Sequence, residues 1–242
     1  MPRLLLIDSF NLIFRAFHAR QRMNAAPMRT SRGTSTEAIY IFHNMLRKLR
    51  KQYAPEYLAA VFESEGPTFR DEQFEAYKAN RAETPPELVE QIPAISRMLE
   101  ALRVPVLKAP GYEADDVIGT VARKAAAEGV EVWIVSSDKD MLQLVGGNVR
   151  MLDMMKNDTL YDAEKVREFK GVPPERIADL LALTGDSVDN IPGAPGIGDK
   201  GAVQLLEQFG SVAELLGRAG EVQRKAYRES LQGHREQIEL SL

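Results

Sequence analysis

The most constraining feature of this sequence is a regular alternation of short apolar runs with amphipathic stretches. Strand-length apolar runs cover residues 3–7, 57–62, 104–107 and 130–136, with a fifth at 149–152. Helical periodicity fills the intervals at residues 36–52, 87–102 and 113–128. Continuous apolar runs are typical of parallel strands, and strands joined through helices make right-handed crossovers. The sequence therefore predicts an α/β fold with a parallel sheet flanked by helices.

The pattern changes after residue 160 to short helices broken by Gly and Pro, predicted at residues 163–169, 174–183, 200–209 and 212–216 before a polar tail. We therefore predict an α/β catalytic core at residues 1–160 and an all-helical lobe at residues 161–242. Residues 69–81 are charged and aromatic without a core stripe. This segment is expected to be a mobile helical element over the edge of the sheet.

The composition excludes several classes of protein. There is no cysteine, which removes disulfides and zinc–thiolate sites and suits a reducing cytoplasm. No apolar run is long enough to span a membrane, and Met1, Pro2 and Arg3 lead straight into the first strand without a visible signal peptide. We expect a cytoplasmic protein with no membrane partner.

The charge is unevenly distributed along the chain. With 31 Lys and Arg against 35 Asp and Glu, the net charge of −4 argues against binding a polyanion through bulk charge. Residues 9–55, however, contain Glu37 as their one acid together with nine bases. These bases are Arg15, Arg20, Arg22, Arg29, Arg32, Arg47, Lys48, Arg50 and Lys51. Two interpretations stay open for this basic block: solvated helix faces, or a positive wall for a polyanion.

Carboxylates follow the ends of four predicted strands. They are Asp8 after the first, Glu63 after the second, Glu113, Asp115 and Asp116 after the third, and Asp138 and Asp140 after the fourth. Singly, such residues are explained as helix caps and first-turn acids. Together, at the edge where parallel sheets bind ligands, they would repel unless cations were bound. Ligands that are all oxygen favour Mg²⁺ or Mn²⁺.

A second acidic pair, Asp186 and Asp189, is spaced so that one helical turn or a tight loop can aim both side chains the same way. Two metal ions held by many carboxylates suit phosphoryl transfer, because attacking and leaving oxygens both carry charge.

The glycine motif at residues 196–201 matches the letters of a dinucleotide fingerprint, but no strand precedes it. The P-loop pattern also fails, because Asp199 separates Gly198 from Lys200. We favour a helix-hairpin-helix motif near residues 185–209, in which Gly196 and Gly198 let the backbone approach a DNA phosphate at a helix N-terminus. A simple Gly/Pro turn is the alternative.

A basic and aromatic cluster occupies residues 77–81. Tyr77 could stack on a base, while Lys78 and Arg81 could hold a phosphate. The alternative is a solvated helix face.

Taken together, these segments resemble the 5′-nuclease domain at the N-terminus of bacterial DNA polymerase I, in the flap endonuclease superfamily with its PIN-like fold. The matching segments are residues 4–8, 14–19, 77–81, 110–119, 137–144, 185–193 and 196–198. The resemblance implies cleavage of DNA at a 5′ flap or 5′ end, in replication and repair, by two Mg²⁺ ions that Mn²⁺ can replace. It also implies a monomer in the bacterial nucleoid, fused to a polymerase or acting with one.

The resemblance also implies roles for individual residues. The first metal is assigned to Asp8, Glu113, Asp115 and Asp116, and the second to Asp138, Asp140, Asp186 and Asp189. Arg15, Lys78 and Arg81 are implied to contact phosphates, with Lys78, Arg81 and Asp116 as the catalytic residues. A helical arch is implied near residues 67–100. The hairpin, with Gly196, Gly198 and Lys200, is implied to bind duplex DNA and to hold K⁺.

The sequence departs from the family pattern at a few positions. Glu63 replaces an Asp and is expected either to ligate through water or to shift the first metal, and Ser9 and Ser137 replace Gly. One alternative function is a DNA-junction binding module with weak or absent catalysis. Another is a metal-dependent small-molecule phosphatase, which leaves the basic block unused. The chain is expected to be either a fragment of a longer polymerase or a short stand-alone nuclease.

Overall fold

The computed structural model describes residues 1–22, 24–74 and 76–242, with side chains at 21 and 22 left out. The chain divides into two compact units. The first, the sheet unit, contains residues 1–68, 82–141 and 147–160; the second, the helical unit, contains residues 69–81, 142–146 and 161–242.

The sheet has the strand order β3-β2-β1-β4-β5-β6. Its strands are β1 (Arg3–Asp8), β2 (Tyr57–Val61), β3 (Val106–Leu107), β4 (Glu131–Val135), β5 (Val149–Asp153) and β6 (Thr159–Tyr161). All pairings from β3 to β5 are parallel, which confirms the predicted α/β class. The chain moves from β1 to β2 on one side and later returns to β4 on the other. The order therefore reverses between β1 and β4, and the carboxyl ends of these two strands form the crevice where such sheets bind ligands.

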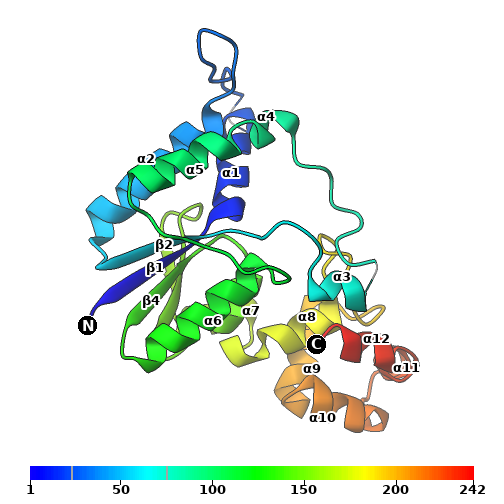
Figure 1. Cartoon of the computed structure of the whole chain (residues 1–242). Coiled ribbons are helices and arrows are strands. Elements are labelled where there is room, and N and C mark those ends of the chain that lie inside the picture. Colours follow the sequence, from blue (N-terminus) through cyan, green and yellow to red (C-terminus); the bar gives the residue numbers. More distant parts are fainter. Residues whose placement is uncertain (23, 75) are drawn as a thin grey trace. The chain divides into compact units, whose positions relative to one another are not determined.

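Helices cover both faces of the sheet (Figure 1). One face carries α1 (Ser9–Arg22), α2 (Glu37–Tyr53), α4 (Pro86–Val89) and α5 (Ile92–Ala101), and the other carries α6 (Ala114–Ala127). Leu5 and Ile7 point to the first face, where they join one buried cluster with Phe42 and Leu99. Alternate residues of a strand face opposite sides, so Leu6 is left for the α6 side.

The prediction of one continuous helix at residues 87–102 is wrong, because the structure has two helices there, α4 and α5. Pro93 explains the break. Its nitrogen carries no hydrogen, and in a continuous helix its ring would clash with the carbonyl group four residues earlier, at Val89. Leu88 and Leu99 are fully buried, so these two helices belong to the core of the sheet unit.

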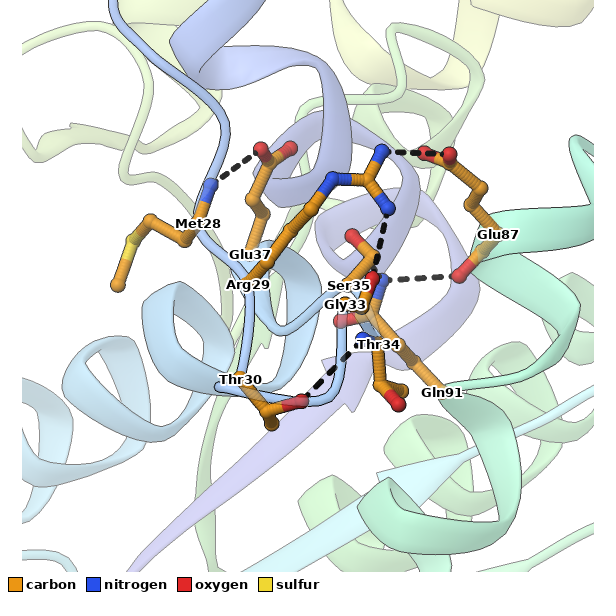
Figure 2. Close-up of polar contacts among 9 residues, drawn as sticks. All are labelled: Met28, Arg29, Thr30, Gly33, Thr34, Ser35, Glu37, Glu87 and Gln91. Atoms are coloured by element: carbon orange, nitrogen blue, oxygen red, sulfur yellow. Dashed lines mark hydrogen bonds and ion pairs between the residues drawn. The ribbon is translucent and has the colours of Figure 1, made fainter.

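A short hairpin at residues 28–36 joins α1 to α2 and is fastened to α4 and α5 (Figure 2). Arg29 forms a 2.7 Å ion pair with Glu87. The buried amide of Gln91 accepts hydrogen bonds from the backbone N–H groups of Ala38 and Ile39, at 3.0 and 3.3 Å. Gln91 thus supplies acceptors for the first turn of α2, whose N–H groups have no partner within the helix.

The helical unit contains α3 (Phe69–Gln73), α7 (Ala163–Lys170), α8 (Ile177–Thr184), α9 (Asp199–Phe209), α10 (Val212–Gly217), α11 (Lys225–Gly233) and α12 (Arg235–Leu240). The tail predicted to be merely polar folds as α11 and α12, which bury Leu231 and Ile238. Within the described part of the chain, every helix is too short or too polar to cross a membrane.

Candidate functional site

Hydrogen bonds link the carboxyl ends of β1 and β4. Asp8 is 5% exposed and accepts a hydrogen bond from the backbone of Asn11, in the first turn of α1. The hydroxyl of Ser136 donates to Asp8 Oδ2 at 2.6 Å, and the backbone N–H of Asp138 donates to the same hydroxyl at 2.9 Å. Two predicted site residues, one at the end of β1 and one in the loop after β4, are therefore joined through one serine.

The Asp8 carboxyl group is electrostatically perturbed. Its pKa is raised from 3.8 to about 6, chiefly by burial and also by the negative charges of Asp138 and Glu63, against the lowering effect of the hydrogen bonds from Ser136 and Asn11. Carboxylates from three strands thus act on one another, as the shared edge of the sheet predicts. Glu63 itself is exposed.

Arg15 and Asn11 hold the loop after β4. The side-chain oxygen of Asn11 accepts from the Ser137 N–H at 3.4 Å and from Arg15 Nε at 3.2 Å. Arg15 Nη2 lies 3.5 Å from the Ser137 carbonyl oxygen, and Asp138 Oδ1 accepts the Asp140 N–H at 3.0 Å. Arg15, the predicted phosphate contact, therefore lies at the same edge as the carboxylates.

The three acids before and within the first turn of α6 also have a local role. Glu113 is buried at the N-cap, and its backbone N–H donates to Asp116 Oδ2 at 3.0 Å in a capping box. Asp115 and Asp116 are half-buried. The helix they begin packs against β1 and β4.

The chemistry of the donor set fits a hard divalent cation. Among residues 1–22, 24–74 and 76–242, no group of three or more acidic or His side chains is gathered closely enough to hold a metal ion. Asp8, Asp116 and Asp138 instead accept hydrogen bonds from neighbouring donors. Two buried hydroxyls in the described chain, those of Ser64 and Ser137, have no hydrogen-bond partner, and both follow strand ends at this edge. Carboxylate oxygens are the ligands that Mg²⁺ or Mn²⁺ prefers, and an unsatisfied buried hydroxyl leaves a polar atom available for a further partner.

In the helical unit, Asp186 and Asp189 lie on one tight loop. The backbone of Asp186 pairs with Ile191 through two hydrogen bonds of 2.9 and 2.8 Å. At the base of this loop, the backbones of Gly185 and Gly193 are in close contact. A Cβ on Gly193 would lie 2.4 Å from the Gly185 nitrogen. Of the two arrangements that the spacing allowed, the structure has the tight loop.

The segment at residues 69–81, Glu75 excepted, is fastened to this loop. Asn80 donates to the Ser187 carbonyl at 2.8 Å, and Asn190 donates to the Ala76 carbonyl at 2.7 Å. The backbone of Lys78 donates to the Asp189 carbonyl at 3.0 Å. Arg81 completes the attachment with an ion pair to the Asp189 carboxylate.

The predicted aromatic and cationic residues of this segment also lie together. Lys78 Nζ is 4.9 Å from the centre of the Tyr77 ring, and the Lys78 backbone is left-handed with φ of 55°. Tyr77, Lys78 and Arg81 thus share one short turn beside the acidic loop.

The glycine hairpin connects two helices, as the helix-hairpin-helix interpretation requires. It follows α8, with Gly196 at a left-handed φ of 79°, and Gly198 immediately precedes α9. Lys200 is exposed in the first turn of α9. An exposed helix N-terminus flanked by glycine is suited to a phosphate group.

Sequence reasoning missed Asn11, Ser136, Asn80 and Asn190, which orient the predicted site residues. The position of Asn11 in the first helical turn after Asp8 was an available signal. No local signal could have paired Asn80 with Ser187, since 107 residues separate them.

A parallel sheet with acidic residues at its switch point and a helical unit with a glycine hairpin define a PIN-like nuclease fold. The family described as "5'-3' exonuclease, N-terminal resolvase-like domain" matches residues 3–171, and "5'-3' exonuclease, C-terminal SAM fold" matches residues 172–242. The chain belongs to the 5′-3′ exonuclease family.

Sequence relatives agree with this assignment, and a solved structure shares the fold. The 5′-3′ exonuclease of Aquifex aeolicus is 41% identical over 241 residues, covering 100% of this chain and 80% of that protein. DNA polymerase I of Rhizobium leguminosarum is 43% identical over 245 residues, covering 98% of this chain but 24% of that protein. A bacteriophage T5 flap endonuclease, solved with DNA and metal ions, shares the fold with a TM-score of 0.80 at 23% identity, covering 99% of this chain and 87% of that one. The chain thus spans about a quarter of the polymerase relatives it matches.

Proposed function

We propose that this chain is a divalent-metal-dependent 5′-nuclease that hydrolyses DNA phosphodiesters at 5′ flaps or 5′ ends. The observation that carries the proposal is the linked edge of Asp8, Ser136 and Asp138, where burial and neighbouring negative charge raise the pKa of one carboxyl group in a member of an exonuclease family. Such a carboxyl gains a favourable partner when a cation binds.

The metal ligands we propose are the nine carboxylates Asp8, Glu63, Glu113, Asp115, Asp116, Asp138, Asp140, Asp186 and Asp189. Two bound Mg²⁺ ions would supply an activated water and stabilise charge on the attacking and leaving oxygens. Arg15, held by Asn11, would orient a phosphate near the sheet edge. Lys78 and Arg81 would neutralise the phosphate's charge, and Tyr77 would stack on a base.

The glycine hairpin is proposed to hold the duplex through its backbone phosphates, using Gly196, Gly198 and Lys200, with K⁺ at the same loop. Such contacts fix the position of the DNA without reading its sequence. The chain matches part of DNA polymerase I in its relatives. We therefore include in the proposal that it acts at the bacterial chromosome, either fused to a polymerase or together with one.

The test is cleavage of an end-labelled duplex carrying a 5′ flap, with and without Mg²⁺, by the wild-type chain and an Asp116→Asn variant. We expect cleavage by the wild-type chain that requires Mg²⁺, and a loss of at least about a hundredfold in the variant. Binding of the flap in EDTA is measured alongside. Cleavage that survives the substitution, or binding with no cleavage by the wild-type chain, would overturn the proposal.

A further inference from the structure

The bases of residues 9–55 do not all lie on one surface. Arg15 lies at the carboxyl edge of the sheet, and Arg29 is paired with Glu87, while the side chain of Arg22 is outside the described part. Four other bases, Arg47, Lys48, Arg50 and Lys51, lie on the last two turns of α2.

These four cations lie at the opposite end of the sheet from the carboxylates. The chain passes from α2 to the first residue of β2 through residues 54–56 only. The carbonyl oxygen of Tyr53, at the end of α2, accepts a hydrogen bond from Arg3 Nη1, at the start of β1. Since β2 is five residues long, roughly 15 Å separates this end of the sheet from the edge that holds Glu63.

Two of the four cations have structural partners, and the other two have none within the described part of the chain. Lys48 pairs with Asp158 at 2.5 Å, and Arg50 donates to the Leu102 carbonyl at the end of α5 at 2.8 Å. The side chains of Arg47 and Lys51 are exposed and have no hydrogen-bond or ion-pair partner among the residues that the structure describes. Asn44 and the four cations line an open depression.

We propose that this depression, the α2 cationic surface, binds the phosphate backbone of duplex DNA at a place separate from the carboxylate edge. The positive charge of its four cations suits phosphates, and interfaces between proteins contain little Lys. Arg47 and Lys51 are one helical turn apart, about 6 Å along the axis. Duplex DNA presents a negative charge about every 1.7 Å, so both cations reach phosphates of one bound segment.

The choice of DNA as the polyanion rests on the proposed function, but binding at this surface does not require cleavage. The contact is independent of base sequence, because it involves phosphates alone. It also depends on salt, because each neutralised phosphate releases a counterion.

The test compares two double variants with the same loss of charge. Arg47→Gln with Lys51→Gln removes the two unpaired cations, and Arg123→Gln with Lys124→Gln removes two exposed cations of α6 as a matched control. Affinity for a blunt duplex is measured in EDTA over a series of salt concentrations. We expect the slope of log K against log salt to become shallower by about 2 in the α2 variant and to stay unchanged in the control.

An unchanged slope in the α2 variant, or an equal change in the control, overturns the proposal. Polyglutamate, an acidic polypeptide, is tested with the same variants. An α2 variant that loses binding to polyglutamate but keeps its binding to the duplex also overturns the proposal. The proposed function fails in a different assay, when the wild-type chain does not cut a flap in Mg²⁺.

Discussion

Arg81 donates two hydrogen bonds to one carboxylate oxygen of Asp189, from Nε at 3.0 Å and from Nη2 at 2.5 Å. The pair joins a proposed phosphate contact to a proposed metal ligand. These two hydrogen bonds compete with a cation for the same oxygen of Asp189. We therefore expect the binding of a cation at Asp189 to be coupled to the release of Arg81.

We expect an Arg81→Gln variant to bind Mn²⁺ more tightly than the wild-type chain in the absence of DNA, because the cation no longer competes with the guanidinium. Arg81 is partly exposed, so a pair of this kind contributes no more than about 1 kcal/mol, or about fivefold in affinity. Calorimetric titration with Mn²⁺ measures the change. Arg167→Gln, which removes an exposed arginine of α7, is the control. Equal or weaker Mn²⁺ affinity in Arg81→Gln contradicts the coupling.

Asp8→Asn is expected to stabilise the metal-free protein at neutral pH. Burial raises the pKa of Asp8 from 3.8 to about 6, so the unfolded chain loses this proton at lower pH than the folded chain. The free energy of unfolding of the wild-type chain therefore falls as pH rises from about 4 to about 6, by up to about 3 kcal/mol. Asparagine does not ionise and avoids this loss.

Urea unfolding in EDTA at about pH 4 and about pH 8 tests this expectation. The exposed acid Glu100, changed to Gln, serves as the control. Asp8→Asn should gain stability relative to the wild-type chain only at the higher pH. The same difference at both pH values would mean that the ionisation of Asp8 does not limit stability.

Glu63→Asp is expected to raise the rate of flap cleavage. Glu63 contributes to the charge around Asp8, yet its side chain is one methylene longer than the family's Asp and is exposed. A carboxylate at the wrong depth places a cation poorly, and small misplacements of reacting groups lower rates by large factors. We expect about a tenfold gain in kcat at saturating Mg²⁺. A Glu63→Gln variant should lose activity, and a gain there would contradict ligation by this residue.

Gln91→Ala is expected to destabilise the sheet unit. The buried amide accepts from the N–H groups of Ala38 and Ile39 and donates to Ser35. Its removal leaves buried polar groups without partners, at a cost of about 3 kcal/mol. Urea unfolding measures the loss. Ser96→Ala, which removes an exposed hydroxyl from α5, should cost less than about 0.5 kcal/mol, and equal losses would contradict the role of Gln91.

The strands and the acidic edge could be predicted because their signals are local. A buried parallel strand is continuously apolar, and Asp8 and Asp138 directly follow such runs. Pro93 is a local signal for a helix break, but the helical periodicity on both sides of it favoured one continuous helix. The pairing of Arg81 with Asp189 was not predictable, since 108 residues separate them and both residues are common in solvated loops. Whether all nine carboxylates bind metal stays a prediction.

The close contact between the backbones of Gly185 and Gly193 brings together the two ends of the acidic loop, residues 185–193. The base of this loop has no space for an inserted residue, because a single Cβ on Gly193 would already lie 2.4 Å from the Gly185 nitrogen. The exposed tip of the hairpin at residues 30–34 has room to lengthen. In a library of random single-residue insertions, survivors should therefore accumulate at the hairpin tip and be missing between Gly185 and Gly193.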